Sequence, residues 1–318
     1  MNAFATRGLL LIALLAMQTS VQAMETDQFY AWGKPIEDSA DYLNAWLRLQ
    51  VRDALESKPG DAPLSCEEAQ HRVQKRMQHS IYHPIEIWAI NSELVDKVPN
   101  GLEEFRVYRA NYTLSKAFPI YIGRSLQPSP TIQANGVRFG TDKLAHFFSE
   151  GWWYYKWWRK HHDEYAPDEV ERKMIRWGMK VEWWLLGMYV TGVVSMADLE
   201  ANLQGFHFYY GLCHGDNPLL TQTDGAWTLS EQFDFRDYIN PDWDESWNPN
   251  IYGEHRWKGV KPTMMTYCPM LQDPWVVKQR ARYREHSTET LTRKLVAERV
   301  AAGKWPDPMR FDITTVCN

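Results

Sequence analysis

The sequence lacks most of the local patterns that identify a reaction. It has no G-x-S-x-G, H-E-x-x-H, P-loop or dinucleotide-binding pattern in a usable context, so the enzyme classes that depend on them are not indicated. Its cysteines form no C-x-x-C pair, which argues against a thiol-redox or zinc-ribbon role. The net charge is −5 and there is no basic run, which argues against nucleic acid or anionic lipid as the main partner.

Long apolar runs are also missing. The longest after the N-terminus, residues 183–196, is shorter than the roughly 20 residues that cross a bilayer, and we interpret it as a core helix. Residues 1 to about 23 combine Arg7, a short apolar core and a small-x-small pattern ending at Ala23, which is typical of a cleavable secretory signal. We therefore predict a periplasmic or secreted mature chain, residues 24–318, with no transmembrane segment.

Four cysteines lie far apart, and in an exported protein two disulfides are the expected outcome. Spacing leaves all three pairings open among Cys66, Cys213, Cys268 and Cys317. The chain is rich in aromatic residues, with 16 Trp, 16 Tyr and 12 Phe. Such side chains serve protein cores, membrane interfaces and sugar-binding platforms, so this composition alone does not separate those uses.

Apolar residues recur mainly at helical spacing, which predicts an all-α single domain with a bundle-like core. Ser39 is placed to begin one helix, and Ser65 with Glu68 forms a capping-box pattern for a second. Residues 141–211 predict a central three-helix antiparallel unit. Its expected helices are residues 141–162, 167–189 and 195–210, with Gly211 as the closing residue.

The segments around this unit are expected to be less regular. Residues 125–140 are interpreted as a loop, and residues 215–272, rich in aromatic and acidic residues, as a long ordered loop layer. A last helix is predicted over residues 274–302. The loop layer has two interpretations: a layer held in place by buried tryptophans, which we favour, or a glycan-binding surface. Calcium is a further option for Asp242, Asp244 and Glu245, although the EF-hand arrangement is missing.

The polar residues of the central unit are the candidate site. On the first helix Asp142, His146 and Glu150 fall at i, i+4 and i+8, so they share one stripe, with Lys143 beside them. The third helix places Asp198 and Asn202 four residues apart, and the middle helix carries Glu182 inside an apolar run. If the three helices pack together, these side chains converge.

Two kinds of chemistry fit that convergence, and a structural role is the third interpretation. A carboxylate beside His146 makes it a general base, with Lys143 stabilising an anion. Alternatively, the imidazole and carboxylate groups suit a divalent metal ion, the tentative ligands being His146, Asp142, Glu182 and Asp198. Against both, Asp142 and Asp198 lie where carboxylates simply stabilise helix N-termini. The candidate catalytic residues are therefore His146, Asp142, Lys143, Glu182, Asp198 and Asn202.

Two segments resemble known signatures. Residues 142–147, DKLAHF, and 195–205, SMADLEANLQG, resemble the D-K-x-x-H-F and S-x-x-D-L-x-A-N-x-x-G patterns of VanZ-like proteins and of YfiM-type envelope proteins. Glu182 is similar to an acidic position of the latter group. The resemblance covers residues 138–212 and implies a role in the bacterial envelope, without implying a defined reaction. The chain has neither the membrane spans of VanZ-like proteins nor a lipid-anchor cysteine after its apolar leader.

A run of aromatic residues followed by cations, residues 152–162, ends the first central helix. It leaves peripheral membrane contact open as a role, although we favour core packing by Trp153, Tyr154 and Trp157. The leading hypothesis is an envelope enzyme that acts on a lipid-linked or glycan substrate through the His/Asp/Glu site. The alternative is a non-catalytic periplasmic protein that binds glycan or protein through its aromatic loops.

Overall fold

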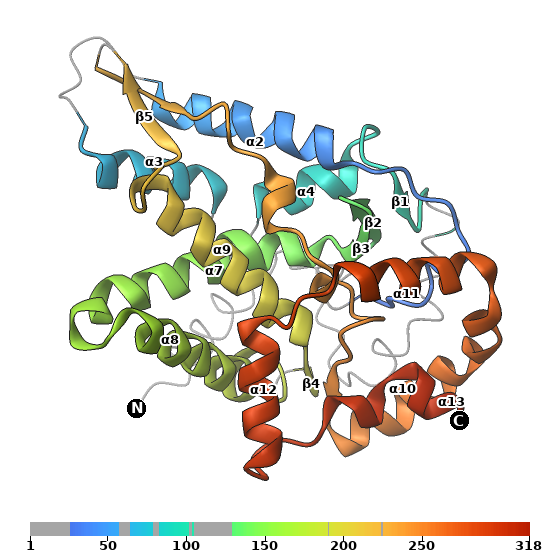
Figure 1. Ribbon diagram of the computed structural model, residues 1–318. Helices are drawn as coiled ribbons and strands as arrows, with labels where there is room; N and C mark the ends of the chain where they lie inside the picture. The colour runs from blue at the N-terminus through green and yellow to red at the C-terminus, as the bar shows by residue number, and fades with distance from the viewer. Residues whose placement is uncertain are drawn as a thin grey trace, which may run out of the picture.

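The protein is mostly helical, as predicted, and its few strands are short. The computed structural model (Figure 1) describes residues 26–56, 64–78, 83–101, 104, 129–189, 191–223 and 225–318. The predicted secretory signal lies outside these residues. No helix in these ranges is both long and apolar enough to cross a membrane.

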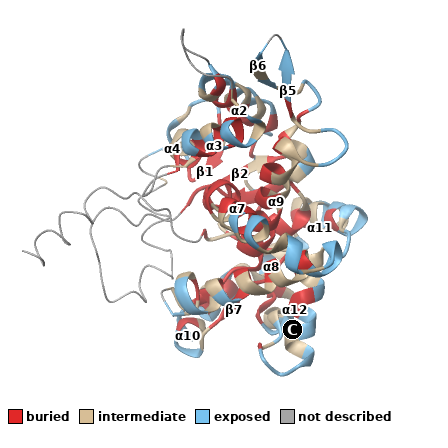
Figure 2. Cartoon of the chain, turned by 90° about the vertical axis from the view of Figure 1, so that its left-hand side faces the viewer, coloured by how far each residue is buried: buried red, intermediate tan, exposed pale blue. Residues whose placement is uncertain are grey.

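Three central helices form the core of the molecule: α7 (Asp142–His161), α8 (Pro167–Val181) and α9 (Met196–Cys213). Helix α8 reverses direction, so α7 and α9 run parallel to each other. Residue pairs along α7 and α9 show this direction, since His146 meets Asn202 and Tyr155 meets His214 further along both helices. Both helices are largely buried, as the red segments of Figure 2 show.

Three helices near the N-terminus cover one side of this core: α2 (Ala40–Leu55), α3 (Cys66–Met77) and α4 (Pro84–Asn91). Helix α3 begins with the predicted capping box. Ser65 Oγ accepts a hydrogen bond from the backbone N–H of Glu68, and the Glu68 carboxylate accepts one from the backbone N–H of Ser65. The Cys66–Cys213 disulfide then fastens the start of α3 to the end of α9.

Part of the segment expected to be a loop is a small sheet. Strands β1 (Lys97–Val98), β2 (Thr131–Ala134) and β3 (Val137–Gly140) pair in that order, and all neighbours are antiparallel. The turn between β2 and β3 is Asn135–Gly136, whose φ angles are 53° and 68°. Asn-Gly is the dipeptide that tolerates two left-handed residues in a row, so it favours a hairpin here. The loop interpretation of these residues was wrong.

The predicted core helix over residues 183–196 is also wrong. Helix α8 ends at Val181 and continues into one π-helical turn, Glu182–Leu186. Trp184, Leu185 and Tyr189 are exposed, and the chain then enters β4 (Val193–Val194). Strand β4 pairs with β7 (Ile251–Tyr252), which requires an extended chain instead of a helix.

Helix α9 is longer than predicted at its C-terminal end. Gly211 lies inside the helix, and it is absent from the glycines with positive φ, so it does not form the left-handed closing turn that was expected. The helix ends two residues later at Cys213, where the disulfide begins.

The predicted loop layer contains regular structure, including one full helix. Besides β7, its elements are β5 (Leu220–Thr223), β6 (Ala226–Leu229), the 3₁₀ turns η4 (Phe235–Tyr238), η5 (Pro241–Trp243) and η6 (Cys268–Gln272), and helix α10 (Glu254–Thr266). Trp243 is fully buried and packs edge-on against Phe139 with ring centroids 5.0 Å apart. A buried tryptophan therefore anchors part of this layer.

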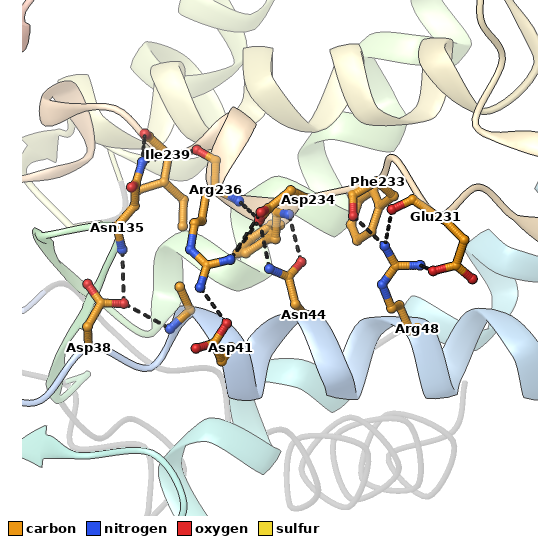
Figure 3. A network of polar contacts seen from close by, with 12 residues as sticks. Asp38, Asp41, Asn44, Arg48, Asn135, Glu231, Phe233, Asp234, Arg236 and Ile239 are labelled. Atoms are coloured by element: carbon orange, nitrogen blue, oxygen red, sulfur yellow. Dashed lines mark hydrogen bonds and ion pairs between the residues drawn. The ribbon is translucent and has the colours of Figure 1, made fainter.

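Polar bonds from α2 anchor another part, residues 231–239 (Figure 3). Arg48 Nη2 donates to the carbonyl oxygen of Phe233 at 2.6 Å, and Asn44 Nδ2 donates to Asp234 Oδ1 at 2.7 Å. These bonds satisfy polar groups of the loop before η4, which pairs with no strand in the part of the chain that the structure describes.

The predicted C-terminal helix is divided in two. Helix α11 (Pro274–His286) stops before Ser287, and α12 (Leu291–Ala301) starts after Thr290, whose Oγ1 accepts a hydrogen bond from Arg293 N–H. The chain ends with η7 (Pro308–Phe311) and α13 (Ile313–Cys317), and Cys317 bonds to Cys268. Both predicted disulfides are formed, and the structure settles their pairing.

Candidate functional site

The predicted polar stripe of α7 faces the interior of the protein. Asp142, His146 and Glu150 follow each other at one turn's spacing along the side of α7 that meets α9. The side chain of Asp142 is buried, whereas His146 and Glu150 keep exposed fractions of 20% and 13%. The stripe therefore leads from a closed interior at Asp142 to a partly accessible edge at His146 and Glu150.

Two glycines, Gly151 of α7 and Gly205 of α9, allow the two helices to approach closely, so that polar residues of α9 lie beside this stripe. A Cβ atom added to Gly205 would lie 1.9 Å from the carbonyl oxygen of Phe147, and one added to Gly151 would lie 2.6 Å from the Cα of Gly205. No side chain fits at either position, so the two backbones touch. This contact sets the register that places Asp198 and Asn202 opposite the stripe of α7.

Lys143 lies at the centre of the network and is entirely buried. Its Nζ atom is 2.6 Å from Asp142 Oδ2, 2.6 Å from Asp198 Oδ1 and 2.5 Å from Glu245 Oε1. Three carboxylates around one ammonium satisfy its donors and supply the opposite charge that a buried lysine needs.

The same three carboxylates are the described group that could hold a metal ion, with ligand oxygens within 4.8 Å of one another. This set differs from the predicted one, because Glu245 takes the place of His146 and Glu182. The Lys143 ammonium already lies within 2.6 Å of each carboxylate. A divalent ion would need that same space, so it fits only if Lys143 moves away.

His146 contacts acceptors through both ring nitrogens. Nε2 lies 3.2 Å from Asp198 Oδ2, and Nδ1 lies 3.2 Å from Asn202 Oδ1 and 3.8 Å from Glu150 Oε2. Burial disfavours its charge, but the carboxylates of Asp198 and Glu150 outweigh burial and raise the pKa of His146 to about 9. At neutral pH the ring is therefore an imidazolium that donates from both nitrogens.

Asp198 joins the two cationic side chains. Burial opposes its ionisation, but the charges of His146 and Lys143 outweigh this effect and lower the pKa of Asp198. Its backbone N–H donates to Ser195 Oγ at 3.1 Å, which is the expected helix cap. Asp198 thus occupies position N3 of α9, where Ser195 caps its backbone N–H. Its ionised carboxylate also belongs to the network.

The side chain of Glu182 reaches the network from the π-helical turn that follows α8. Its Oε2 atom is buried and has no hydrogen-bond partner among the described residues. Burial, followed by the nearby charge of Asp198, raises the pKa of Glu182 to about 8, so its carboxyl is mainly protonated at neutral pH. A Cβ on Gly187 would lie 2.5 Å from Glu182 Oε1, so only glycine lets the turn close around this carboxyl.

Three members of the network were not among the residues predicted for the central site, although Glu245 was named as an option for calcium. Glu245, a loop residue, accepts from Ser195 Oγ and Asn250 Nδ2 besides contacting Lys143. Glu86 is buried on α4, where burial and then the charge of Asp142 raise its pKa well above the usual range. Burial and the positive charge of His146 lower the pKa of His83 to about 4.

A sequence signal existed for Glu86. It is the single charged residue of an apolar run, residues 84–90, which is the pattern that singled out Glu182. Glu245 carried no such signal, because it lies among other acidic residues.

Acidic groups outnumber basic ones at this site. Six carboxyl groups belong to the network together with the ammonium of Lys143 and the imidazole of His146: Asp142, Glu86, Glu150, Glu182, Asp198 and Glu245. Burial raises the pKa of Glu86, Glu150 and Glu182, and so disfavours their charged forms. Burial therefore opposes the ionisation of several of these carboxyl groups, and the partly exposed Glu150 is one of them.

The acidic residues of the loop layer do not converge on one ion. Asp242 pairs with Arg293 at 2.6 Å, Asp244 accepts from Tyr283 at 2.9 Å, and Glu245 contacts Lys143. Each carboxylate is buried against a different partner. The calcium option is therefore not supported by this arrangement, and these carboxylates do not form a glycan-binding surface.

The aromatic run at the end of α7 mainly fills the core, although by different residues from those expected. Trp152, Tyr154 and Tyr155 are buried, whereas Trp153, Trp157 and Trp158 are half-buried and pack against the edge of the core. Of the expected core residues, only Tyr154 is fully inside.

Comparison with protein families, curated proteins and solved structures finds no match for this chain. The resemblance of residues 138–212 to VanZ-like and YfiM-type proteins stays a prediction. The geometry of the site therefore carries the functional argument alone.

Proposed function

We propose that this protein is an exported envelope enzyme that performs acid/base chemistry, of the hydrolase type, on a glycan or lipid-linked substrate. One observation carries the proposal. The imidazole of His146 is held from its buried side by Asp198, at 3.2 Å, and is the most exposed of the ion-paired side chains at the network's edge. A charged network fixed behind one accessible imidazole is the arrangement expected for a positioned acid or base.

Glu150 and His146 take complementary roles in this proposal. In this proposal water attacks the substrate bond, and Glu150, whose pKa is raised by burial, passes the proton released by that water to the leaving oxygen. The imidazolium of His146 stabilises negative charge on the substrate, and Asp198 keeps the ring in place. Glu150 Oε2 and His146 Nδ1 are 3.8 Å apart, which is too long for a direct hydrogen bond. A substrate oxygen or a water molecule bridges that separation.

Export to the periplasm is the second part of the proposal. The N-terminal apolar segment and two complete disulfides both suit an oxidising compartment. Intact mass measurement of protein isolated from an expressing bacterium tests this part. We expect a mature chain that begins at Met24. A protein that stays in the cytoplasm and still carries residues 1–23 would contradict export.

A non-catalytic envelope protein is the alternative, and one observation favours it. Both ring nitrogens of His146 contact acceptors and Lys143 is fully buried, so most charges of the network are paired without any substrate. In that case the network stabilises the helices, and the protein binds its partner elsewhere.

Incubation with fractionated envelope material distinguishes the two. Purified protein is mixed with cell-wall glycan or with lipid-linked oligosaccharide, and the products are identified by mass spectrometry. We expect a product that disappears with His146→Gln and with Glu150→Gln, and that persists with the exposed controls His255→Gln and Glu254→Gln. Lack of product from folded wild-type protein, or equal product from His146→Gln, contradicts the enzyme.

A further inference from the structure

A cleft of about 600 Å³ lies beside α12, separate from the charged network. Helix α12 forms one wall, and residues 247–249, 287–289 and 307–309 form the others. Met196, the first residue of α9, contributes to the lining. This volume suits a small organic ligand, because ligand sites span roughly 300–1,000 Å³.

Most of the lining is apolar. The apolar side chains come from two turns of α12 and from the segments facing it: Val296, Ala297, Val300, Ala301, Pro249, Pro308 and Met309. Ala297 and Met309 are exposed although they line a concave surface. A hydrocarbon chain laid along this wall would remove their surface from water, which is favourable because apolar surface is costly to hydrate.

Polar groups gather on the side formed by Trp247 and Asn248. Asn248 is buried, and its Nδ2 donates to the carbonyl oxygen of Asp242 at 3.0 Å, whereas its Oδ1 has no partner among the described residues. Ser287 Oγ accepts a hydrogen bond from Trp247 Nε1 at 3.1 Å, which leaves the hydroxyl hydrogen free to donate. The cleft therefore offers both an acceptor and a donor beside its apolar wall.

The charges of the cleft disfavour an anionic ligand. Arg293 is the one cation among the lining residues that the structure describes. Asp242 neutralises it through two contacts, Nε to Oδ2 at 2.7 Å and Nη2 to Oδ1 at 2.6 Å. Glu289 and Asp307 are exposed on the rim. Lys294, outside the lining, pairs with Glu289 at 3.6 Å. Among the lining residues that the structure describes, no unpaired cation faces Asp307, so an anionic head group would be repelled there.

We propose that this cleft binds a neutral amphiphile, consisting of an aliphatic chain joined to a hydroxylated head group. The chain lies along Val296, Ala297 and Val300, and the head group exchanges hydrogen bonds with Asn248 and Ser287. The binding site does not depend on whether the charged network is catalytic.

Displacement of a neutral fluorescent probe tests the site. N-phenyl-1-naphthylamine is bound to the oxidised protein and displaced by hexyl or octyl glucoside, below their micelle-forming concentrations. Octyl sulfate and octyltrimethylammonium serve as charged comparisons. We expect octyl glucoside to displace the probe more effectively than hexyl glucoside and at least tenfold more effectively than octyl sulfate.

Two variants of α12 then locate the site. Ala297→Trp fills the cleft from an exposed helix position and is expected to weaken octyl glucoside binding at least tenfold, whereas Ala302→Trp lies outside the lining and should change it less than twofold. Circular dichroism confirms that both variants fold. Three outcomes overturn the proposal. The first is no probe binding by the wild type, and the second is octyl glucoside binding by Ala297→Trp equal to that of the wild type. The third is loss of binding in Trp184→Ser, since Trp184 is exposed and lies outside the cleft.

Discussion

Asp198 Oδ1 lies 2.6 Å from Lys143 Nζ at a point where the lysine has no contact with solvent. The pair joins α7 to α9 through opposite charges in the interior, beside two further carboxylates. A buried charge is stabilised by its oppositely charged partners. Removing one partner leaves the others as unpaired buried charges, which lowers the free energy of unfolding.

Replacement of Lys143 by Met should therefore destabilise the protein strongly. The change keeps the approximate length of the side chain but leaves Asp142, Asp198 and Glu245 without their shared cation. We expect a loss of about 3–5 kcal/mol in the free energy of unfolding, measured by urea denaturation. Lys180→Met, at an exposed position of α8, is the control and should change stability by less than about 0.5 kcal/mol.

The stability of the fold should decrease as the pH rises from about 6.5 to 9. The folded-state pKa of His146 is about 9, because Asp198 and Glu150 outweigh burial, compared with 6.5 for an unperturbed histidine. The stabilisation from its charged ring is complete below pH 6.5 and is lost as the pH rises through 9, an effect on the order of 3 kcal/mol.

Glu182 adds to this slope, because its pKa is also raised, from 4.5 to about 8, by burial and by Asp198. Its favourable contribution is complete below pH 4.5 and is lost as the pH rises through 8. Urea titrations at several pH values measure the combined slope. The slope should become shallower in His146→Gln, and an unchanged slope in that variant would count against the proposed charge of the ring.

Gly205→Ala should be one of the most damaging single-methyl additions in the protein. The new Cβ would lie 1.9 Å from the Phe147 carbonyl oxygen, so α7 and α9 must separate. We expect a loss of about 3 kcal/mol or more, as in other overpacked cores. Gly211→Ala, in the same helix, meets only ordinary contacts at 3.6 Å and should be neutral or stabilising by up to about 1 kcal/mol.

Removal of metal ions should leave the fold intact. Lys143 supplies the positive charge among Asp142, Asp198 and Glu245, so the melting temperature should change by less than about 1 °C on addition of EDTA. Differential scanning calorimetry with and without added Mn²⁺ provides the measurement. A marked rise with Mn²⁺ would instead mean that the ion displaces the ammonium.

Loss of the Cys66–Cys213 bond should weaken the attachment of α3 to α9. The bond closes a loop with a sequence separation of 147 residues, and the double variant Cys66→Ser/Cys213→Ser should lose about 2–5 kcal/mol. Chemical denaturation of this variant is compared with the wild type under oxidising conditions. An unchanged transition would mean that the packing of α3 already fixes this end of the molecule.

The sequence predicts the central helices and much of the site because both depend on local periodicity. His146 and Asp198 were placed on facing helices by four-residue spacing and by a helix cap. Glu245 was named only as an option for calcium, and its contact with Lys143 could not be predicted, since it reaches Lys143 from an irregular segment whose path is set by distant contacts. The hairpin at Asn135–Gly136 and the break before Thr290 each have a sequence signal, a turn dipeptide in the first case and a helix-capping residue in the second. Neither signal outweighs the surrounding pattern, which predicts a loop and a continuous helix.

The backbone contact at Gly151 and Gly205 also restricts how this protein can move. Two helices separated by side chains can slide when those side chains change rotamer, but here no such intervening layer exists at the crossing. We therefore expect α7 and α9 to move as a unit, so that any widening of the accessible edge at His146 comes from displacement of the segments around them.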